Sequence, residues 1–457
     1  MRKEQDGPGP PASSAAALAP VAAAELPRKL GLADATLIVI GIVIGSGIFL
    51  LPNLIAQKLP SGAAIVAVWL VAGVLSSFGA MAYAELGAMI PATGGQYVYL
   101  REAYGPGCAF LCGWVFVLAV VPGGIAFLSV GFSIYLAQFV ALSPAMRDLV
   151  SVLLVALLSA ANYIGVKEGA WIQRVFTSLK MAGLALVIGA AAFTSHAAQP
   201  APGTPPALSY SGIGFAMAAC LMAYNGWSYV SFVAGEVTEP RRNLPRSLAL
   251  GMAIVMVLYL GANLAYLRVM TVPEMAVTER VGAAAAARSM GPAGGTVVAA
   301  VVLLSIVGAI NGCILTGPRI PFAQARDGLF FRAFGRVHPR FQTPSFAIGM
   351  QALWTVLLIL SGSYETLCSY TILAAWLFYT LGVGAVRVLR RKAPAAPRPY
   401  RMWGYPFTLW GFVIVSAWFM VDALVNQPGP SLAALAIALA GVPFYFIWRK
   451  REKPCEH

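Results

Sequence analysis

The sequence predicts an all-α protein that crosses a membrane many times, and three observations carry this prediction. Hydrophobic residues make up 59% of the 457 residues and charged residues only 11%, against about a quarter in soluble domains. Apolar runs recur along the whole chain, and about 18 such residues suffice to cross a hydrocarbon core of about 30 Å. The runs are continuous rather than alternating, so they favour spanning helices over a transmembrane β-barrel.

We expect twelve spanning helices, with boundaries accurate to a few residues. Their predicted ranges are 31–55, 61–89, 106–139, 148–165, 170–194, 212–236, 245–270, 294–317, 344–362, 366–390, 405–425 and 431–449. The segment 1–28 is rich in Ala, Pro and Ser and predicts a disordered cytosolic tail. Residues 29–450 are then one transmembrane domain, and 451–457 are a second short tail.

The formal net charge is +14, which raises the question of a nucleic-acid partner. The basic residues, however, gather in short clusters between apolar spans, at 241–246, 319–340, 387–401 and 449–453. With the N-terminus in the cytosol, only five fall on the outer side: Lys58, Arg147, Arg268, Arg280 and Arg288. This bias follows the positive-inside rule. It predicts a plasma-membrane protein, in a bacterial inner membrane, with both ends cytoplasmic and no nucleic-acid partner.

The six cysteines show no metal-like spacing, and most fall inside apolar spans: Cys108, Cys112, Cys220, Cys313, Cys368 and Cys455. We interpret them as buried small side chains rather than a disulfide framework. The three histidines lie in loops or at the chain end, so no histidine proton relay is visible. We expect no metal and no cofactor.

Two of the predicted spans contain helix-weakening residues near their middle. The first carries glycines from Gly41 to Gly47, and the sixth contains Tyr224-Asn225-Gly226. Spans 31–194 and 212–390 form two blocks of five, and each block opens with its broken helix. Because five is odd, the second block starts on the opposite side of the membrane. This arrangement predicts an inverted repeat with a site near the middle of the membrane. Residues 405–449 add two further helices.

The breaks suggest which chemistry the site performs. Unwinding at Gly45-Ser46-Gly47 frees N–H groups at the start of a half-helix, which attract a carboxylate. Freed carbonyls at Met222, Ala223 and Asn225 suit an ammonium group. Together they fit a zwitterionic amino acid. Taken alone, a Gly-x-Gly in a membrane helix is more often a small-residue packing face.

Lys180 lies about ten residues into the fifth span. A lysine at that depth costs roughly 2.5–3.5 kcal/mol on insertion scales and normally marks function. The alternative is that its side chain extends to the membrane interface. Asp422 and Glu85 also lie in spans and receive no role from the sequence.

Several motifs resemble a known family. Gly45-Ser46-Gly47-Ile48-Phe49 looks like the signature of the amino acid–polyamine–organocation superfamily. Further segments, spread over most of residues 31–449, resemble the L-type amino acid transporter family. They are Ala223-Tyr224-Asn225-Gly226-Trp227, Glu236, Pro240-Arg241-Arg242-Asn243-Leu244-Pro245, Ala325-Arg326-Asp327-Gly328, His338-Pro339 and Arg398-Pro399-Tyr400-Arg401. The resemblance implies the leucine-transporter-like fold, a five-plus-five inverted repeat with helices 1 and 6 broken.

The resemblance also implies roles for individual residues. It places the substrate carboxylate on the N–H groups of Ser46 and Gly47, and the ammonium on carbonyls of Val43, Met222 and Asn225. Ile48 and Ala223 complete the implied substrate-binding set. Lys180 is implied to brace the broken first helix near Gly41, in the place of an ion bound by sodium-coupled relatives, and Tyr259 to work with it. Met222 departs from the family's Phe gate.

We therefore expect a carrier, not an enzyme, that exchanges small neutral L-amino acids without sodium. A proton symporter in which Lys180 titrates is the alternative, and an intramembrane enzyme or channel is disfavoured because no paired carboxylates or continuous polar path are visible. The segments around 43–49 and 222–228 hold no charged side chain. The loop 140–148 has no cysteine, so we expect no disulfide-linked partner. The basic segment 319–340 is interpreted as simple positive-inside anchoring with a turn at Asp327-Gly328.

Overall fold

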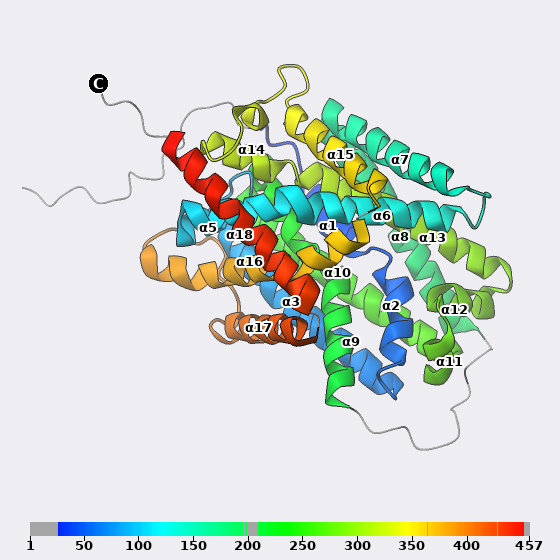
Figure 1. The fold of residues 1–457 in the computed structure, drawn as a ribbon. Helices are drawn as coiled ribbons and strands as arrows, with labels where there is room; N and C mark the ends of the chain where they lie inside the picture. The colour runs from blue at the N-terminus through cyan, green and yellow to red at the C-terminus, as the bar shows by residue number, and fades with distance from the viewer. Residues whose placement is uncertain (1–25, 195–197, 199–208, 363, 427, 452–457) are drawn as a thin grey trace, which may run out of the picture.

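The computed structural model describes residues 26–194, 198, 209–362, 364–426 and 428–451, with the backbone alone for 364–374, 430, 450 and 451. Figure 1 shows the chain as a bundle of helices. The predicted tails fall mostly outside the described residues, as do Cys455, His196 and His457. Leu26 is already buried. The boundaries drawn at 28 and 451 stay predictions.

Within the described residues the chain is helical apart from turns, loops and one isolated bridge between Leu30 and Val237. The first half contains α1 (Leu32–Val43), α2 (Gly47–Ala56), α3 (Gly62–Met89), α4 (Gln96–Tyr104), α5 (Pro106–Val115), the π-helical turn η2 (Phe116–Val120), α6 (Val121–Leu136), α7 (Pro144–Ile164) and α8 (Val166–Phe193). The second half contains α9 (Tyr210–Ala223), the 3₁₀ helix η3 (Trp227–Glu236), α10 (Pro240–Val269), α11 (Val272–Val277), α12 (Val281–Met290), α13 (Ala293–Thr316), α14 (Arg319–Arg326), η4 (Arg332–Gly335), α15 (Ser345–Leu360), α16 (Tyr364–Lys392), α17 (Phe407–Asn426) and α18 (Pro428–Arg451).

The all-helical prediction is confirmed for the described residues. Nine helical segments there are long and apolar enough to cross a membrane, counting α1 with α2, α5 through α6, and α13 through α14 as single spans. The remaining three predicted spans correspond to the α9–η3 pair, the shorter apolar helix α15, and α16. The total of twelve spans stays a prediction.

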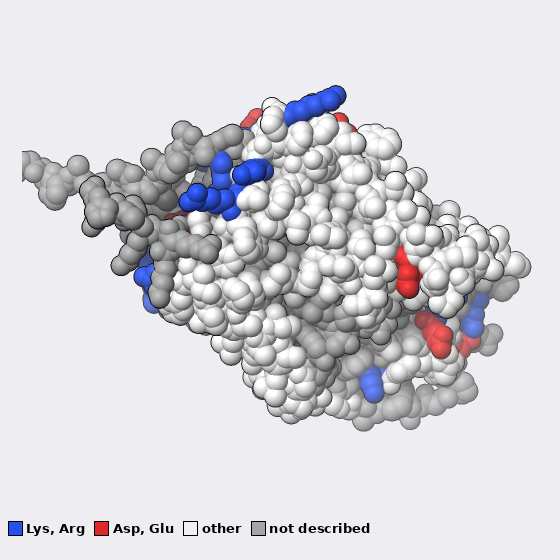
Figure 2. Space-filling view, turned by 45° about the horizontal axis from the view of Figure 1, so that its top comes forward, with Lys and Arg blue, Asp and Glu red and all other residues white. Residues whose placement is uncertain are grey.

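The surface has the distribution of charge expected for a bilayer. In Figure 2, charged side chains lie toward two ends of the visible face, with a broad uncharged region between them. Large apolar side chains are exposed along the outer helices, for example Leu157 on α7, Val257 on α10 and Ile414 on α17. Contact with lipid tails avoids the cost of exposing such apolar side chains to water.

Helix α1 occupies the middle of the bundle, in contact with α8, α10, α13 and η3. Close approach depends on glycine in two of these neighbours. A Cβ on Gly251 of α10 would lie 2.6 Å from Val39 Cγ1, and one on Gly312 of α13 would lie 2.4 Å from Ile42 Cγ1. Small residues allow membrane helices to gain dispersion contacts that lipid cannot supply. This packing places the C-terminal end of α1 at the centre of the molecule.

Glu85, for which the sequence suggested no role, joins three separate segments. Its carboxylate accepts two hydrogen bonds from Arg390 of α16, at 2.9 and 2.6 Å, and one from the Met402 N–H, at 2.7 Å. The buried carboxylate thus has both a charge partner and hydrogen bonds, which it needs away from water. Glu85 fixes α3 to α16 and to the segment that leads into α17.

Candidate functional site

The first predicted break is present and lies between α1 and α2. The backbone leaves helical geometry after Val43, passes through Ile44, Gly45 and Ser46, and becomes helical again at Gly47. A Cβ placed on Gly45 would meet no other group within 4 Å, so this residue borders open space. As the first residues of α2, Gly47 and Ile48 have N–H groups with no intrahelical acceptor. The break therefore presents the positive end of a helix dipole.

The second predicted break lies between α9 and η3, at Tyr224–Gly226. Gly226 has φ +120°, a conformation that side chains other than glycine rarely adopt. A Cβ there would lie 2.7 Å from Ile42 Cγ2 and 3.3 Å from the Val43 nitrogen. Glycine is therefore required twice, for its backbone angle and for its contact with α1. The two breaks meet at this point.

Lys180 of α8 is bound to the first break. Its side chain is buried, and Nζ donates to the carbonyl oxygens of Gly41 at 2.7 Å, Ile44 at 2.8 Å and Ser305 at 3.2 Å. An ammonium group has three donors, so all three are used. The side chain does not extend to the membrane interface. The geometry is that of a cation bracing the carbonyls released where α1 ends.

Tyr259 of α10 joins the two breaks to each other. Its hydroxyl lies 2.8 Å from the Val43 oxygen and 3.1 Å from the Ala223 oxygen. Ser305 of α13 adds a bond from its hydroxyl to the Ile44 oxygen at 2.8 Å. The phenol ring is buried, and its hydroxyl oxygen lies within hydrogen-bond distance of both unwound segments.

A buried polar ladder runs from Lys180 along the same face of α8 and was not foreseen from the sequence. Thr177 Oγ1 and Gln173 Nε2 both approach the Leu37 oxygen, each at 3.4 Å. Gln173 Oε1 accepts from Asn311 of α13 at 2.9 Å, and Asn311 Oδ1 accepts from Asn162 of α7 at 2.8 Å. The spacing 173, 177, 180 follows one helix face, and this polar stripe is the signal in the sequence that could have revealed the ladder.

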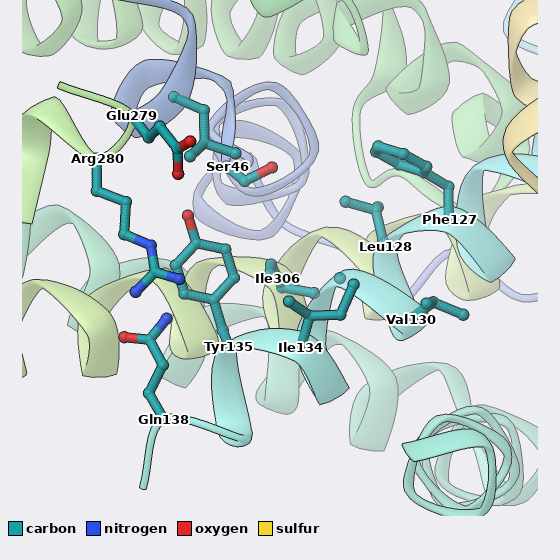
Figure 3. Close-up of a pocket in the computed structure, with 12 residues that line it drawn as sticks. Ser46, Phe127, Leu128, Val130, Ile134, Tyr135, Gln138, Glu279, Arg280 and Ile306 are labelled. Atoms are coloured by element: carbon teal, nitrogen blue, oxygen red, sulfur yellow. The ribbon is translucent and has the colours of Figure 1, made fainter. Parts of the chain in front are cut away.

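A cavity of about 290 Å³ begins at the first break. It is lined by Ser46 at the break, Leu50 of α2, Ile306 of α13 and a row of residues along α6, together with Glu279 and Arg280 (Figure 3). Along α6 the lining runs from Phe127 to Tyr135, which at 1.5 Å per residue is a rise of about 12 Å, and Gln138 follows just after the helix. The size of the cavity matches the lower end of small-molecule sites, about 300 Å³.

The opposite end of the bundle, where α1 begins, is closed by ion pairs that the sequence did not reveal. Arg319 and Glu236 are both buried and form a two-pronged pair at 2.7 and 2.8 Å. The interpretation of Arg319 as a simple surface anchor is therefore wrong, because α14 continues from α13 and carries it into the interior. Asp34 of α1 pairs with Arg174 of α8 at 2.7 Å.

Asp327 is likewise more than a turn residue, since it accepts hydrogen bonds from Tyr97 and Arg101 of α4. Burial disfavours the charged form of Arg101, but attraction to Asp327 outweighs it and raises the pKa of the guanidinium. We call these contacts, with Glu236–Arg319 and Asp34–Arg174, the α1-end closure.

The residues implied to hold the substrate are brought together only in part. Gly47 and Ala223 face each other across the breaks, and a Cβ on Gly47 would lie 3.6 Å from that of Ala223. Ser46 lines the cavity, whereas the side chains of Val43 and Ile48 are buried. Met222 is 44% exposed.

The carbonyls expected to bind an ammonium are already engaged. The Val43 oxygen accepts from Tyr259 and from the Gly45 N–H, at 2.8 and 2.9 Å, and the Met222 oxygen accepts from the Asn225 N–H at 3.1 Å. Among the described residues, no group of three or more His, Cys, Asp or Glu side chains is arranged to hold a metal ion.

Comparison with known proteins agrees with this architecture over nearly the whole chain. The family model for amino acid permeases matches residues 30–443. The chain is 31% identical over 432 residues to the serine/threonine exchanger SteT of Bacillus subtilis (strain 168), covering 93% of this chain and 98% of that protein.

Two human proteins are similarly related. The large neutral amino acids transporter small subunit 2 is 31% identical over 449 residues, covering 94% of this chain and 82% of that protein. The b(0,+)-type amino acid transporter 1 is 30% identical over 435 residues, covering 93% and 88%. The predicted family is confirmed: the chain belongs to the amino acid permeases of the amino acid–polyamine–organocation superfamily, and it is a multi-pass membrane transporter rather than an enzyme.

Proposed function

We propose that this protein exchanges small neutral L-amino acids across the plasma membrane, without sodium, by alternating access. The observation that carries the proposal is the position of the α2 amide end: it lies where the two helix breaks meet, and Ser46 beside it lines a cavity of amino-acid size. The similarity to a protein named as a serine/threonine exchanger supports both the substrate class and the exchange mechanism.

In this proposal the substrate's main chain is recognised by the protein's main chain. The carboxylate lies on the N–H groups of Ser46, Gly47 and Ile48, where the helix dipole and unpaired donors favour an anion. The ammonium lies near Val43, Met222 and Asn225. A carbonyl oxygen can accept two hydrogen bonds. Tyr259 and the Gly45 N–H already occupy both positions on the Val43 oxygen, so the Met222 and Asn225 carbonyls are the stronger candidates.

A neutral side chain fits the uncharged part of the cavity. The uncharged part of the lining includes Ser46, Leu50, Val130 and Ile306. A charged substrate side chain would lose its water there without gaining an opposite charge. Met222, partly exposed beside the second break, would replace the family's aromatic gate as a flexible cap.

Alternating access assigns the two ends of the bundle to the two sides of the membrane. The cavity end would face outward and the α1-end closure would face the cytoplasm, with both chain termini cytoplasmic and twelve spans arranged as an inverted repeat. The basic clusters at 241–246 and 387–401 would then lie inside, as the positive-inside rule requires. We expect no disulfide-linked partner, since residues 137–143 between α6 and α7 contain no cysteine.

Lys180 would supply the permanent positive charge that makes a sodium ion unnecessary. A proton symporter in which Lys180 titrates is the second candidate. It is favoured by one observation: the described hydrogen-bond partners of Nζ are three carbonyl oxygens and no carboxylate. The ammonium therefore has no ion-pair partner among the described residues.

Uptake into proteoliposomes decides between the two. With an inward proton gradient and no internal amino acid, we expect little accumulation of labelled serine or alanine. Preloading with unlabelled substrate should then start rapid exchange, with or without sodium. Concentrative uptake into empty vesicles would replace the exchanger with the symporter, and absence of transport in both arms would contradict the proposed substrate class.

Gly47→Leu tests the location of the site. A leucine there would extend past Ala223 into the space where the two breaks meet, so exchange should be abolished while the protein still inserts and elutes as a single species. Gly349→Leu is the matched control, because this exposed glycine of α15 has no group within 4 Å of a Cβ. Normal exchange by the Gly47→Leu protein would remove the carboxylate site from the first break.

A further inference from the structure

The cavity that Ser46 lines also has a charged and polar region in its wall. Four residues line this region: Tyr135 and Gln138 at the end of α6, and Glu279 and Arg280 in the turn between α11 and α12. Figure 3 shows the Arg280 guanidinium beside Tyr135 and Gln138, with the Glu279 carboxylate on the side of this group toward Ser46. We call this group the outer cluster.

Glu279 and Arg280 are adjacent in the chain, yet they do not neutralise each other. Among the residues that the structure describes, neither side chain has a hydrogen bond or an ion pair. Other charges on the same segment are paired: Glu274 accepts a hydrogen bond from Arg288 at 2.8 Å. The outer cluster thus holds one negative and one positive group that line the same cavity. Both can still form hydrogen bonds or ion pairs with a ligand.

The turn that presents these charges is held from several sides. Asn53 of α2 donates to the Met275 and Ala276 oxygens of α11, at 2.9 Å each. Thr271 and Glu274 form a capping box at the start of α11. On the other side of the turn, α12 packs against α13 and α2. The positions of the two charges are therefore defined by the scaffold, which lowers the entropy cost of binding a ligand between them.

We propose that the outer cluster is a docking subsite for a zwitterionic amino acid, separate from the site at the helix breaks. Arg280, with the Gln138 amide, binds the carboxylate, and Glu279 binds the ammonium. The ligand needs both charges, so a simple amine or a simple carboxylic acid binds less well. The subsite lies within the same cavity as Ser46, so a docked amino acid can move inward to the break without returning to solvent. This inference rests on the proposed transport of amino acids.

Sidedness of the kinetics gives the first test. Arg280→Gln and Glu279→Gln should each raise the KM for external substrate by about threefold to tenfold, the range expected for one solvent-exposed charge contact. The maximal rate, and the KM measured from the α1 end in inside-out vesicles, should stay unchanged. Arg147→Gln is the matched control, since it removes an exposed charge at the same end of the bundle, at the start of α7 and outside the cavity lining.

Protection from chemical labelling gives the second test. Ile134→Cys, at an exposed position of the same cavity lining, should react with a membrane-impermeant thiol reagent, and external serine should slow this reaction. Ethanolamine and glycolate, which each carry one of the two charges, should protect less. The protein without the introduced cysteine controls for labelling of native thiols.

The same labelling in the Gly47→Leu background separates the two sites. If the outer cluster binds independently, serine still protects Ile134→Cys although transport is lost. Protection that disappears with Gly47→Leu, or an external KM that moves no more than in Arg147→Gln, would overturn the subsite while leaving the proposed exchange intact. A wild-type protein without amino acid exchange would contradict the proposed function, whatever the labelling shows.

Discussion

Lys180 Nζ lies 2.7 Å from the carbonyl oxygen of Gly41, at the place where the first helix of the bundle stops. The same nitrogen binds the Ile44 oxygen, so one cation holds both sides of the last turn of α1. A helix that ends inside a membrane leaves carbonyl groups without partners, and each must be satisfied by the protein. Here a lysine from α8 does so.

Lys180→Met should reduce exchange by at least about tenfold and lower the melting temperature. Loss of the ammonium leaves buried carbonyls unpaired, at about 1–3 kcal/mol for such a group. Lys180→Arg should not restore exchange, because a Cβ placed on Gly308 would lie only 3.2 Å from Lys180 Cε and Nζ, which leaves little room for a guanidinium. Lys167→Met, at an exposed position on the same helix, should behave as wild type. Full exchange by Lys180→Met would contradict the bracing role.

Gly41→Ala should be strongly destabilising, because its Cβ would lie 1.8 Å from Gln173 Nε2 and 2.5 Å from Thr177 Oγ1. The conflict is with a side chain, so Gly41→Ala combined with Gln173→Ala should recover part of the lost stability. Thermal unfolding of the two single variants and the double variant measures this coupling. Gly124→Ala is the control, since no group lies within 4 Å of a Cβ there. If the stability losses of the two single variants simply add in the double variant, the Gln173 side chain is not the reason that position 41 requires glycine.

Glu236→Gln should lower stability by about 3–5 kcal/mol, since it leaves Arg319 buried without a counter-charge. Replacing both residues, Glu236→Gln with Arg319→Gln, should cost less than the single change, because no uncompensated charge remains. Thermal unfolding in detergent compares the variants. Glu239→Gln serves as the control, as its side chain is 71% exposed and 3.7 Å from Arg242. A single variant as stable as wild type would show that the pair does not close the α1 end.

The segment α11–α12 should become locally less stable below pH 4.5. The hydrogen bond from Arg288 is the main cause that lowers the pKa of Glu274 from 4.5 to about 2. A carboxyl group whose pKa is lower in the folded than in the unfolded protein stabilises the fold at pH values above its unfolded-state pKa. This stabilisation is lost as the pH falls toward the folded-state pKa. The side chains of this pair are 41% exposed, so we expect no more than about 1 kcal/mol.

Hydrogen exchange of α11 peptides at pH 5 and pH 3, corrected for the intrinsic rate, measures this change. The wild-type protein should lose protection between the two values, whereas Glu274→Gln should show the lower protection at both. Equal protection of the wild-type protein at pH 5 and pH 3 would contradict the contribution of the Glu274–Arg288 pair.

The sequence by itself determined the all-helical class, the transporter family and the location of both helix breaks. These features depend on local causes. Long apolar runs form spanning helices because the backbone must pair its polar groups within the segment, and Gly45-Ser46-Gly47 and Asn225-Gly226 weaken the helix where they occur. Lys180 was recognisable because a charge inside an apolar run is costly.

Only the tertiary structure decided which groups meet. Nothing in the sequence indicated that Arg319 would turn into the interior to pair with Glu236, since its neighbours form an ordinary basic cluster. Nor did it show that Glu279 and Arg280, in an outer turn, would line the cavity that begins at Ser46. These contacts join segments far apart in the chain, and their geometry follows from how α1, α6, α11 and α13 pack. Packing depends on shape complementarity over the whole bundle, which no short stretch of sequence encodes.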